Sequence, residues 1–480
     1  MKNYSVYESP LAGRYAGKQM SFIWSAQKKH STWRRLWLAL AEVEKELGLN
    51  ISDMQINEMR SHLDDVDFER AELLEKELRH DVMSHIHAFG EQCPNAMSII
   101  HLGATSCYVT DNTELIQIKE SLELVKTKLL KLIAVFASLS EKYADLPVLG
   151  FTHFQPAQLT TLGKRFSLYL QDLYFDFQRV EFELEHLPFR GVKGTTGTQA
   201  SFLALFEGNH EKVMRLDTLV SQKMGFLSSI SVSGQTYTRK VDYYIISLLS
   251  GIAQSCYKFA GDIRLLSHLR EVEEPFETKQ IGSSAMAYKR NPMRCERICS
   301  LARYIMSLPA NAANTHSNQW FERTLDDSAN RRIILGEAFL GLDVVLSIVF
   351  NVASGLQIWP KVISSRIERE LPFMATENII MAAVKLGGDR QAVHEAIRKH
   401  SMEAIKKVKE EGLENDLISR IKADQLFSKI TNIDDIMNHA DFIGRAPQQV
   451  TEFIANEIRP LLNRYQSILN GSDSFEQLDI

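Results

Sequence analysis

The sequence predicts an all-α protein with a central bundle of long helices, and two observations carry that prediction. Apolar residues recur at steps of three and four from Leu115 to Leu139, the spacing of a helix that packs along a nearly parallel or antiparallel partner. Two further runs, residues 239–270 and 332–358, are apolar on nearly every side. Helices of that kind are buried all round, so we expect both at the centre of the bundle.

Length and composition are those of a soluble globular chain. The 480 residues suffice for about three domains of ordinary size, with 45% hydrophobic and 24% charged residues. The net charge of -5 argues against a nucleic-acid surface but permits a local basic pocket. The first residues lack the apolar core of a secretion signal, so we expect a cytoplasmic protein.

The cysteines argue against a metal-binding protein, and the polar residues within the apolar runs argue against a membrane-spanning one. Five scattered cysteines are typical of reduced cytosolic thiols, and no His or Cys cluster completes a metal site, so we expect no metal. Gln254, Lys258 and Asp262 interrupt the run over 239–270, which argues against a membrane span. The cysteines are Cys93, Cys107, Cys256, Cys295 and Cys299.

A first helical domain is expected over residues 1–110. The apolar spacing over residues 33–47 predicts a helix that ends at Gly48. Ser52 should cap a short helix after it, and a charged helix follows over residues 69–78.

The bundle is expected over residues 111–358. Asp111 and Glu114 are predicted as the N-terminal capping pair of its first helix, and another helix is expected from about residue 160 to 186. Prolines and glycines divide residues 359–480 into short helices, which predicts a smaller all-α domain at the end of the chain.

One connecting segment, residues 276–290, has the composition of a functional loop. It is small and polar around Ser283 and carries two cations at 289–290. Asn291 and Pro292 are predicted as the N-cap and first position of the next helix, whose dipole begins with its positive end. The segment therefore suits binding of carboxylates or lowering of a serine pKa. The alternative is a solvated hinge.

Three other polar segments could carry chemistry. Residues 79–81 set a histidine beside an aspartate that can fix its tautomer, or they are an exposed polar helix end. His153 lies in a loop rich in hydrogen-bonding groups, or is a satisfied buried side chain. Arginines beside Ser328 within residues 320–332 suit a phosphate clamp, because guanidinium groups bind phosphate oxygens in pairs. The alternative there is a self-neutralised charge run.

The order of residues in these segments resembles a known enzyme superfamily. Gly-Ser-Ser-x-Met-x-x-Lys-x-Asn, at residues 282–291, is similar to the signature of the fumarase/aspartase superfamily. Lys-Arg-Asn-Pro at 289–292 resembles its adenylosuccinate lyase family, as does the segment 320–332. Thr-His-x-Gln at 152–155 resembles the second signature of the superfamily. Ala287 departs from the pattern, which normally has proline there, but the change removes no chemical group.

This resemblance covers essentially the whole chain and implies a fold, an assembly and a reaction. It implies an all-α subunit of three domains, and a homotetramer whose bundles unite in one core and whose active sites are shared between subunits. The reaction is β-elimination of fumarate from adenylosuccinate, giving AMP, and from succinylaminoimidazole carboxamide ribotide of purine biosynthesis. No cofactor is needed, because the carboxylate of the substrate accepts the electrons. No nucleic acid or membrane partner is implied.

The roles of individual residues also follow from the resemblance. Ser283 is expected to be the base, with its alkoxide stabilised by Lys289 and by the positive end of the next helix. His153 is expected to be the acid for the leaving nitrogen, and His80 to position it or the substrate. The expected substrate-binding residues are Thr105, Ser106, Gln235 and Asn291 at the carboxylates, Arg14, Tyr15, Arg297, Arg323, Ser328 and Arg332 at the nucleotide, and in addition Arg79, Asp81 and Thr152.

Two other functions remain open on the sequence. Another lyase of the superfamily could act on argininosuccinate, but that substrate has no phosphate to occupy the arginines of residues 320–332. A crystallin-like structural protein on the same scaffold is expected to have lost Ser283, His153 or Lys289, and all three are present.

Overall fold

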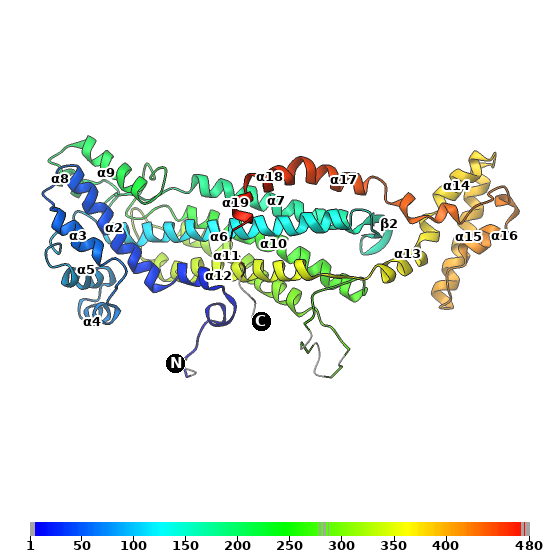
Figure 1. The fold of residues 1–480 in the computed structure, drawn as a ribbon, viewed down its shortest axis with the longest axis horizontal. Helices are drawn as coiled ribbons and strands as arrows, with labels where there is room; N and C mark the ends of the chain where they lie inside the picture. Colours follow the sequence, from blue (N-terminus) through cyan, green and yellow to red (C-terminus); the bar gives the residue numbers. More distant parts are fainter. Residues whose placement is uncertain (1–4, 278–279, 282–284, 287, 472–474, 476–480) are drawn as a thin grey trace.

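The chain folds into an elongated molecule with a helical bundle at its centre and smaller groups of helices at both ends (Figure 1). The computed structural model describes residues 5–277, 280–281, 285–286, 288–471 and 475. Helices dominate the described residues, and the prediction of an all-α fold is confirmed.

Five long helices form the bundle. The longest has 37 residues and spans about 55 Å at about 1.5 Å per residue. The predicted seam from Leu115 to Phe136 is buried along its length. The five helices are α6 (Ser106–Lys142), α7 (Leu162–His186), α10 (Lys240–His268), α11 (Met293–Ser317) and α12 (Asp326–Gly355).

The last of these helices, α12, lies deep inside the protein. It is long and apolar enough to cross a membrane, but 83% of its most apolar stretch is buried within the fold, as in the core helix of a globular protein. The all-round apolar pattern that places it at the centre of the bundle is thus confirmed.

One end of the molecule is built from the N-terminal helices, joined by two helices from the middle of the chain (Figure 1). Trp33 and Trp37 fill its core. Ser52 forms the predicted cap, as part of a reciprocal capping box with Gln55. The elements of this end are α2 (Ala26–Glu46), α3 (Asp53–Ser61), α4 (Phe68–Leu78), α5 (Asp81–Gln92), α8 (Ala200–Leu205) and α9 (His210–Lys223). Before them, η1 (Leu11–Tyr15) and α1 (Lys18–Ile23) lie against the bundle, where η1 contacts α12 and α1 contacts α6 and α12.

The first bundle helix begins earlier than predicted. It starts at Ser106 with Thr105 at the N-cap, so Asp111 and Glu114 lie inside it rather than at its end. The capping prediction is therefore wrong. The carboxylate of Asp111 is buried and accepts hydrogen bonds from the Arg239 guanidinium and from the backbone N–H of Tyr237.

Two short antiparallel pairs of strands, which the sequence did not predict, lie at the far end of the bundle from α5. A hairpin of β1 (Pro147–Thr152) and β2 (Gln155–Thr161) turns at His153 and Phe154. The second pair joins β3 (Val272–Glu273) to β4 (Gln357–Ile358), and so holds the end of α10 against the end of α12.

The C-terminal helices divide into two groups. Residues 375–433 enclose a separate small core, whereas Val450, Ile454 and Ile458 belong to the main core, because the last helices run back along the bundle (Figure 1). The division at residues 110 and 358 stays a prediction. The elements are α13 (Pro360–Met374), α14 (Thr376–Lys385), α15 (Arg390–Glu410), α16 (Leu417–Ala423), η2 (Gln425–Phe427), η3 (Asp435–Met437), η4 (His439–Phe442), α17 (Ala446–Phe453), η5 (Ile454–Ile458), α18 (Arg459–Arg464) and α19 (Gln466–Leu469).

Candidate functional site

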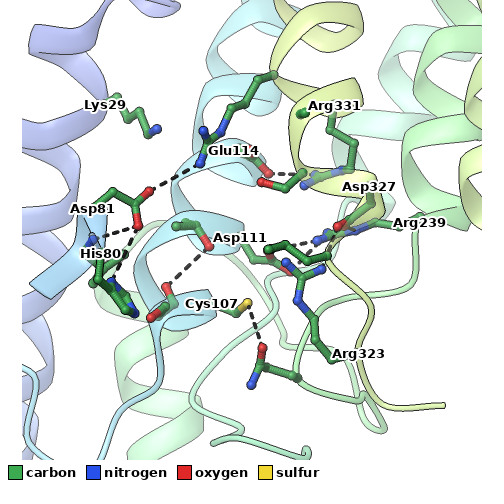
Figure 2. Close-up of a pocket in the computed structure, with 18 of the residues that line it drawn as sticks. Lys29, His80, Asp81, Cys107, Asp111, Glu114, Arg239, Arg323, Asp327 and Arg331 are labelled. Atoms are coloured by element: carbon green, nitrogen blue, oxygen red, sulfur yellow. Dashed lines mark hydrogen bonds and ion pairs between the residues drawn. The ribbon is translucent and has the colours of Figure 1, made fainter. Parts of the chain in front are cut away.

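A cavity of about 600 Å³ lies where the N-terminal helices meet the bundle (Figure 2). Its walls come from the junction of α4 and α5, the first turns of α6, the segment before α10 and the start of α12. The fold thus gathers residues that are far apart in the sequence. The predicted site residues that line it are Arg79, His80, Asp81, Ser106, Gln235, Arg323, Ser328 and Arg332.

The segment between α4 and α5 turns sharply into this cavity. Arg79 has a left-handed backbone conformation, with φ of 54°, which ends α4, and His80 is the N-cap of α5. The backbone N–H of Met83 donates to Nδ1 of His80 at 3.3 Å, so a neutral ring carries its proton on Nε2. Asp81 accepts from Arg332 at 3.3 Å. His80 therefore both caps a helix and lines the cavity.

A network of mostly buried charged residues forms part of the cavity wall (Figure 2). Arg323 donates to one oxygen of Asp327 at 2.7 Å, and Arg239 donates to the other oxygen at 2.7 Å. Arg239 also binds Asp111, at 3.1 and 3.2 Å. Burial opposes ionisation of Asp111, but the nearby guanidinium groups prevail and lower its pKa below the usual value. Within this charge network, the Arg323 side chain remains partly exposed.

The arginines of residues 320–332 have different partners. Arg331 is buried and pairs with Asp242 at 2.6 Å and Glu114 at 2.7 Å, while Arg332 is exposed. Neutralisation within the run itself is found for Arg323, whose partner Asp327 belongs to the same segment, although part of the Arg323 side chain stays exposed at the cavity. It is not found for Arg331 and Arg332, because their carboxylate partners come from other elements.

Sequence reasoning missed several residues that line the cavity. Burial lowers the pKa of Lys29 and raises the pKa of the Cys107 thiol to about 11, so the thiol is protonated near neutral pH. The sequence pattern predicts Asp111 and Glu114 as helix-capping residues and not as residues of a cavity wall. Which charges face inward depends on helix packing, so no local pattern distinguishes these residues from surface ones. The missed lining residues are Lys29, Glu75, Cys107, Thr110, Asp111, Glu114, Arg239 and Asp327.

Other predicted residues lie away from this cavity in the same chain. His153 and Thr152 belong to the exposed turn of the β1–β2 hairpin, at the opposite end of the bundle (Figure 1). His153 has a φ of 51°, uncommon for a residue with a side chain. Lys289 is exposed, in the segment before α11. Ser283 lies outside the described residues.

A third group of predicted residues lies on η1 and α11. The guanidinium groups of Arg14 and Arg297 lie 5.5 and 5.7 Å from the centre of the Tyr15 ring. Both distances are within the range of a cation–π contact. The remaining predicted residue at the nucleotide or carboxylates, Thr105, is the N-cap of α6 and precedes Ser106 at the cavity wall.

The helix that follows the signature segment differs from the prediction in two respects. It begins at Met293, with Pro292 at the N-cap and Asn291 before it. The carboxylate of Glu274 accepts the backbone N–H groups of Arg294 and Cys295, both at 3.0 Å. This carboxylate opposes the positive end of the helix dipole, and the expected stabilisation of the Ser283 alkoxide by that end stays a prediction.

Over the part of the chain that the structure describes, no group of three or more His, Cys, Asp or Glu side chains is placed to hold a metal ion. Among the residues described, the cavity lining combines six lysine and arginine side chains with five carboxylates, and among these cations Arg323 and Arg332 keep part of their surface exposed. It is suited to an anionic, phosphate-bearing molecule.

Two protein families match the chain. The Lyase family matches residues 4–307, and the family described as Adenylosuccinate lyase C-terminus matches residues 372–453. Similar curated proteins are the adenylosuccinate lyases of Saccharomyces cerevisiae, Schizosaccharomyces pombe and Schistosoma mansoni, at 55%, 52% and 47% identity. In each case the match covers 98% of this chain and 98% of the relative.

Solved structures share the fold at lower identity. A 3-carboxy-cis,cis-muconate lactonizing enzyme from Pseudomonas putida superposes with a TM-score of 0.81 at 20% identity, covering 94% of this chain and 99% of that one. A fumarate lyase from Mesorhizobium sp. BNC1 superposes with a TM-score of 0.78, also at 20% identity, covering 93% and 99%. These two similarities establish the architecture only.

Proposed function

The chain belongs to the adenylosuccinate lyase family, and from this premise we propose that it cleaves adenylosuccinate into AMP and fumarate. It is a carbon–nitrogen lyase. The same elimination acts on succinylaminoimidazole carboxamide ribotide. A base removes a proton from the succinyl carbon, the C–N bond breaks, and the departing nitrogen receives a proton.

The observation that carries this proposal is the cavity at the N-terminal end of the bundle, which two partly exposed arginines face. Its volume of about 600 Å³ is within the usual range for small-molecule sites, about 300–1,000 Å³. Arg323 and Arg332 face it beside the hydroxyl of Ser328. Guanidinium and hydroxyl groups in this combination suit the phosphate of a nucleotide. Argininosuccinate has no phosphate and leaves these groups without a function.

The roles in the elimination are assigned by the family pattern. Ser283 is the base and His153 the acid, while Lys289 neutralises charge that develops on the base or on the substrate. His80 lines the cavity and can donate from Nε2, which suits a positioning role. The carboxylates of the succinyl group are assigned to Lys289, Thr105, Ser106, Gln235 and Asn291.

The remaining substrate-binding residues are assigned to the nucleotide end. Arg323, Ser328 and Arg332 bind the phosphate from the cavity. Arg14, Tyr15 and Arg297 form a second cationic group that suits the nucleotide of a neighbouring subunit. Arg79, Asp81 and Thr152 complete the set.

We infer a homotetramer from the family pattern, and the separation of these groups supports active sites shared between its subunits. The cavity and His153 lie at opposite ends of a bundle whose longest helix spans about 55 Å, so they cannot act together within one chain. Leu168, Phe175 and Phe182 are exposed at seven-residue steps along α7. Such a stripe suits packing against a helix of another copy. An antiparallel copy brings the hairpin of one chain to the cavity of another.

A cytoplasmic location is part of the same proposal. All five cysteines are free and buried, which suits a reducing compartment. A crystallin-like role without catalysis is disfavoured by the presence of Ser283, His153 and Lys289.

One assay tests the proposed reaction. The purified protein is incubated with adenylosuccinate and, separately, with argininosuccinate, and the release of fumarate is followed by ultraviolet absorbance. We expect turnover of adenylosuccinate only. Turnover of argininosuccinate alone would assign the chain to another lyase, and activity on neither would leave a structural role.

A further inference from the structure

The segment with the Gly-Ser-Ser signature leaves the bundle after β3 and returns to it at α11. Its incoming limb is residues 273–277, and its outgoing limb is residues 288–295. Side chains of each limb bind the other limb, so the two limbs lie together where they join the bundle.

Glu274 makes the most unusual of these contacts. A helix leaves its first amides without partners, and Pro292, at the N-cap of α11, has no side chain that can accept them. Glu274 supplies the cap from the other limb, because its two oxygens accept the N–H groups of Arg294 and Cys295 at 3.0 Å each. The Glu274 side chain is buried, with 6% of the residue exposed. Burial raises its pKa, although both N–H groups oppose that shift.

The contacts are reciprocal. The guanidinium of Arg294 donates to the carbonyl of Pro275 at 2.9 Å and to the carboxylate of Glu277. Arg290 donates to Gln357 of β4 at 3.0 Å, and its guanidinium lies over the ring of Phe276. Each limb therefore holds the other, and the β3–β4 pair holds both to the bundle.

We propose that Glu274 is a positioning residue for the elimination: it sets how the signature segment emerges from the bundle and so where Lys289 and Asn291 act. This inference rests on the proposed function. Arg294 lies twenty positions after Glu274 in the chain. Chain connectivity alone leaves the two limbs free to shift, whereas two hydrogen bonds to one carboxylate fix their relative position. Reacting groups tolerate little displacement, since an error of about 1 Å can cost about 100-fold in rate.

The chemistry of the cap predicts a graded response to substitution. Both oxygens of Glu274 accept N–H groups, whereas a glutamine offers one oxygen and turns an NH₂ group toward the other amide. Glu274→Ala removes both acceptors. The order of kcat should therefore be wild type, then Glu274→Gln, then Glu274→Ala.

Glu271 provides a matched control. It is the same residue type, it is buried to a similar degree, and it lies three residues earlier in the chain. Its ion pair, however, is with Arg366 of α13 at 2.9 Å, outside the signature segment. Glu271→Gln should keep kcat within about twofold of wild type while changing thermal stability.

The experiment combines kinetics and hydrogen exchange on the full-length protein. In Glu274→Ala we expect kcat to fall about 100-fold. Amide exchange in peptides that contain residues 294–295 should be faster in both Glu274 variants and unchanged in Glu271→Gln.

Several results would overturn the proposal. These are a kcat within twofold of wild type in Glu274→Ala, an equal loss of kcat in the Glu271 control, no partial recovery of kcat in Glu274→Gln relative to Glu274→Ala, or unchanged exchange at residues 294–295. Failure of the wild type to cleave adenylosuccinate would reject the proposed function instead. The exchange measurement would still decide whether Glu274 holds the two limbs.

Discussion

Arg323→Ala offers a direct test of the phosphate site. Arg323 faces the cavity, and its hydrogen-bond partner Asp327 keeps a second cation, Arg239, when Arg323 is removed. The substitution should therefore leave the fold largely intact. A lost hydrogen bond to a charged group costs about 2–3 kcal/mol, which corresponds to an increase in KM of about 30- to 150-fold.

Arg331→Ala, on α12 and eight residues further along the chain, is the contrasting variant. Arg331 is buried between Asp242 and Glu114, so its removal leaves two carboxylates without a cation inside the protein. Breaking a buried ion pair in this way costs about 3–5 kcal/mol of stability. We expect a marked fall in Tm for this variant, and at most a small one for Arg323→Ala.

The assay compares adenylosuccinate with its dephosphorylated nucleoside. If Arg323 binds the phosphate, Arg323→Ala should raise KM for the nucleotide and leave kcat/KM for the nucleoside near that of the wild type. A loss of the same factor on both substrates would refute the phosphate assignment. If Tm falls as much in Arg323→Ala as in Arg331→Ala, the conclusion that Arg331 stabilises the fold and Arg323 does not would be refuted.

Three further predictions concern the base, the assembly and the pH dependence of stability. Ser283→Ala should lower kcat by about two to four orders of magnitude with folding intact; near wild-type turnover would reject Ser283 as the base. Inactive His153→Ala and Ser283→Ala proteins, dissociated and mixed in equal amounts, should recover about a quarter of wild-type activity if the two residues come from different chains. No recovery after verified subunit exchange would mean that one chain supplies both. Burial raises the pKa of Glu44 to about 9, so its contribution to stability is full at low pH and is lost as the pH rises between about 4.5 and 9. Glu44→Gln should therefore show a smaller drop in Tm between pH 5 and pH 8 than the wild type does, and an equal drop would contradict this account.

The long helices could be predicted because their pattern is local. The steps of three and four from Leu115 to Phe136 report burial along one face, and that face is buried. The beginning of α6 could not be found in the same way. Asp111 is the residue type that caps a helix, and only the packing of Arg239 against it makes it a buried ion-pair partner instead. The same residue type serves both purposes, so the local sequence does not separate them.

The candidate site was predictable only where a sequence pattern carries it. Residues 79–81 and Ser328 were found through the resemblance, and both line the cavity. Lys29 and Asp327 were missed because their roles depend on which way their helices face. The hairpin at His153 was also missed, because its residues do not alternate between apolar and polar as a strand with one buried face does.

Because α6 is one unbroken helix, its length sets the distance between the two ends of the bundle. One end carries Ser106 at the cavity wall, and the other leads into the hairpin of His153. Inserting one residue moves everything beyond it by about 1.5 Å and rotates it by about 100°. An insertion of seven residues nearly restores the facing but lengthens the rod by about 10 Å. The number of residues in α6 is therefore a functional quantity in its own right, and substitutions can accumulate along this helix far more readily than insertions or deletions.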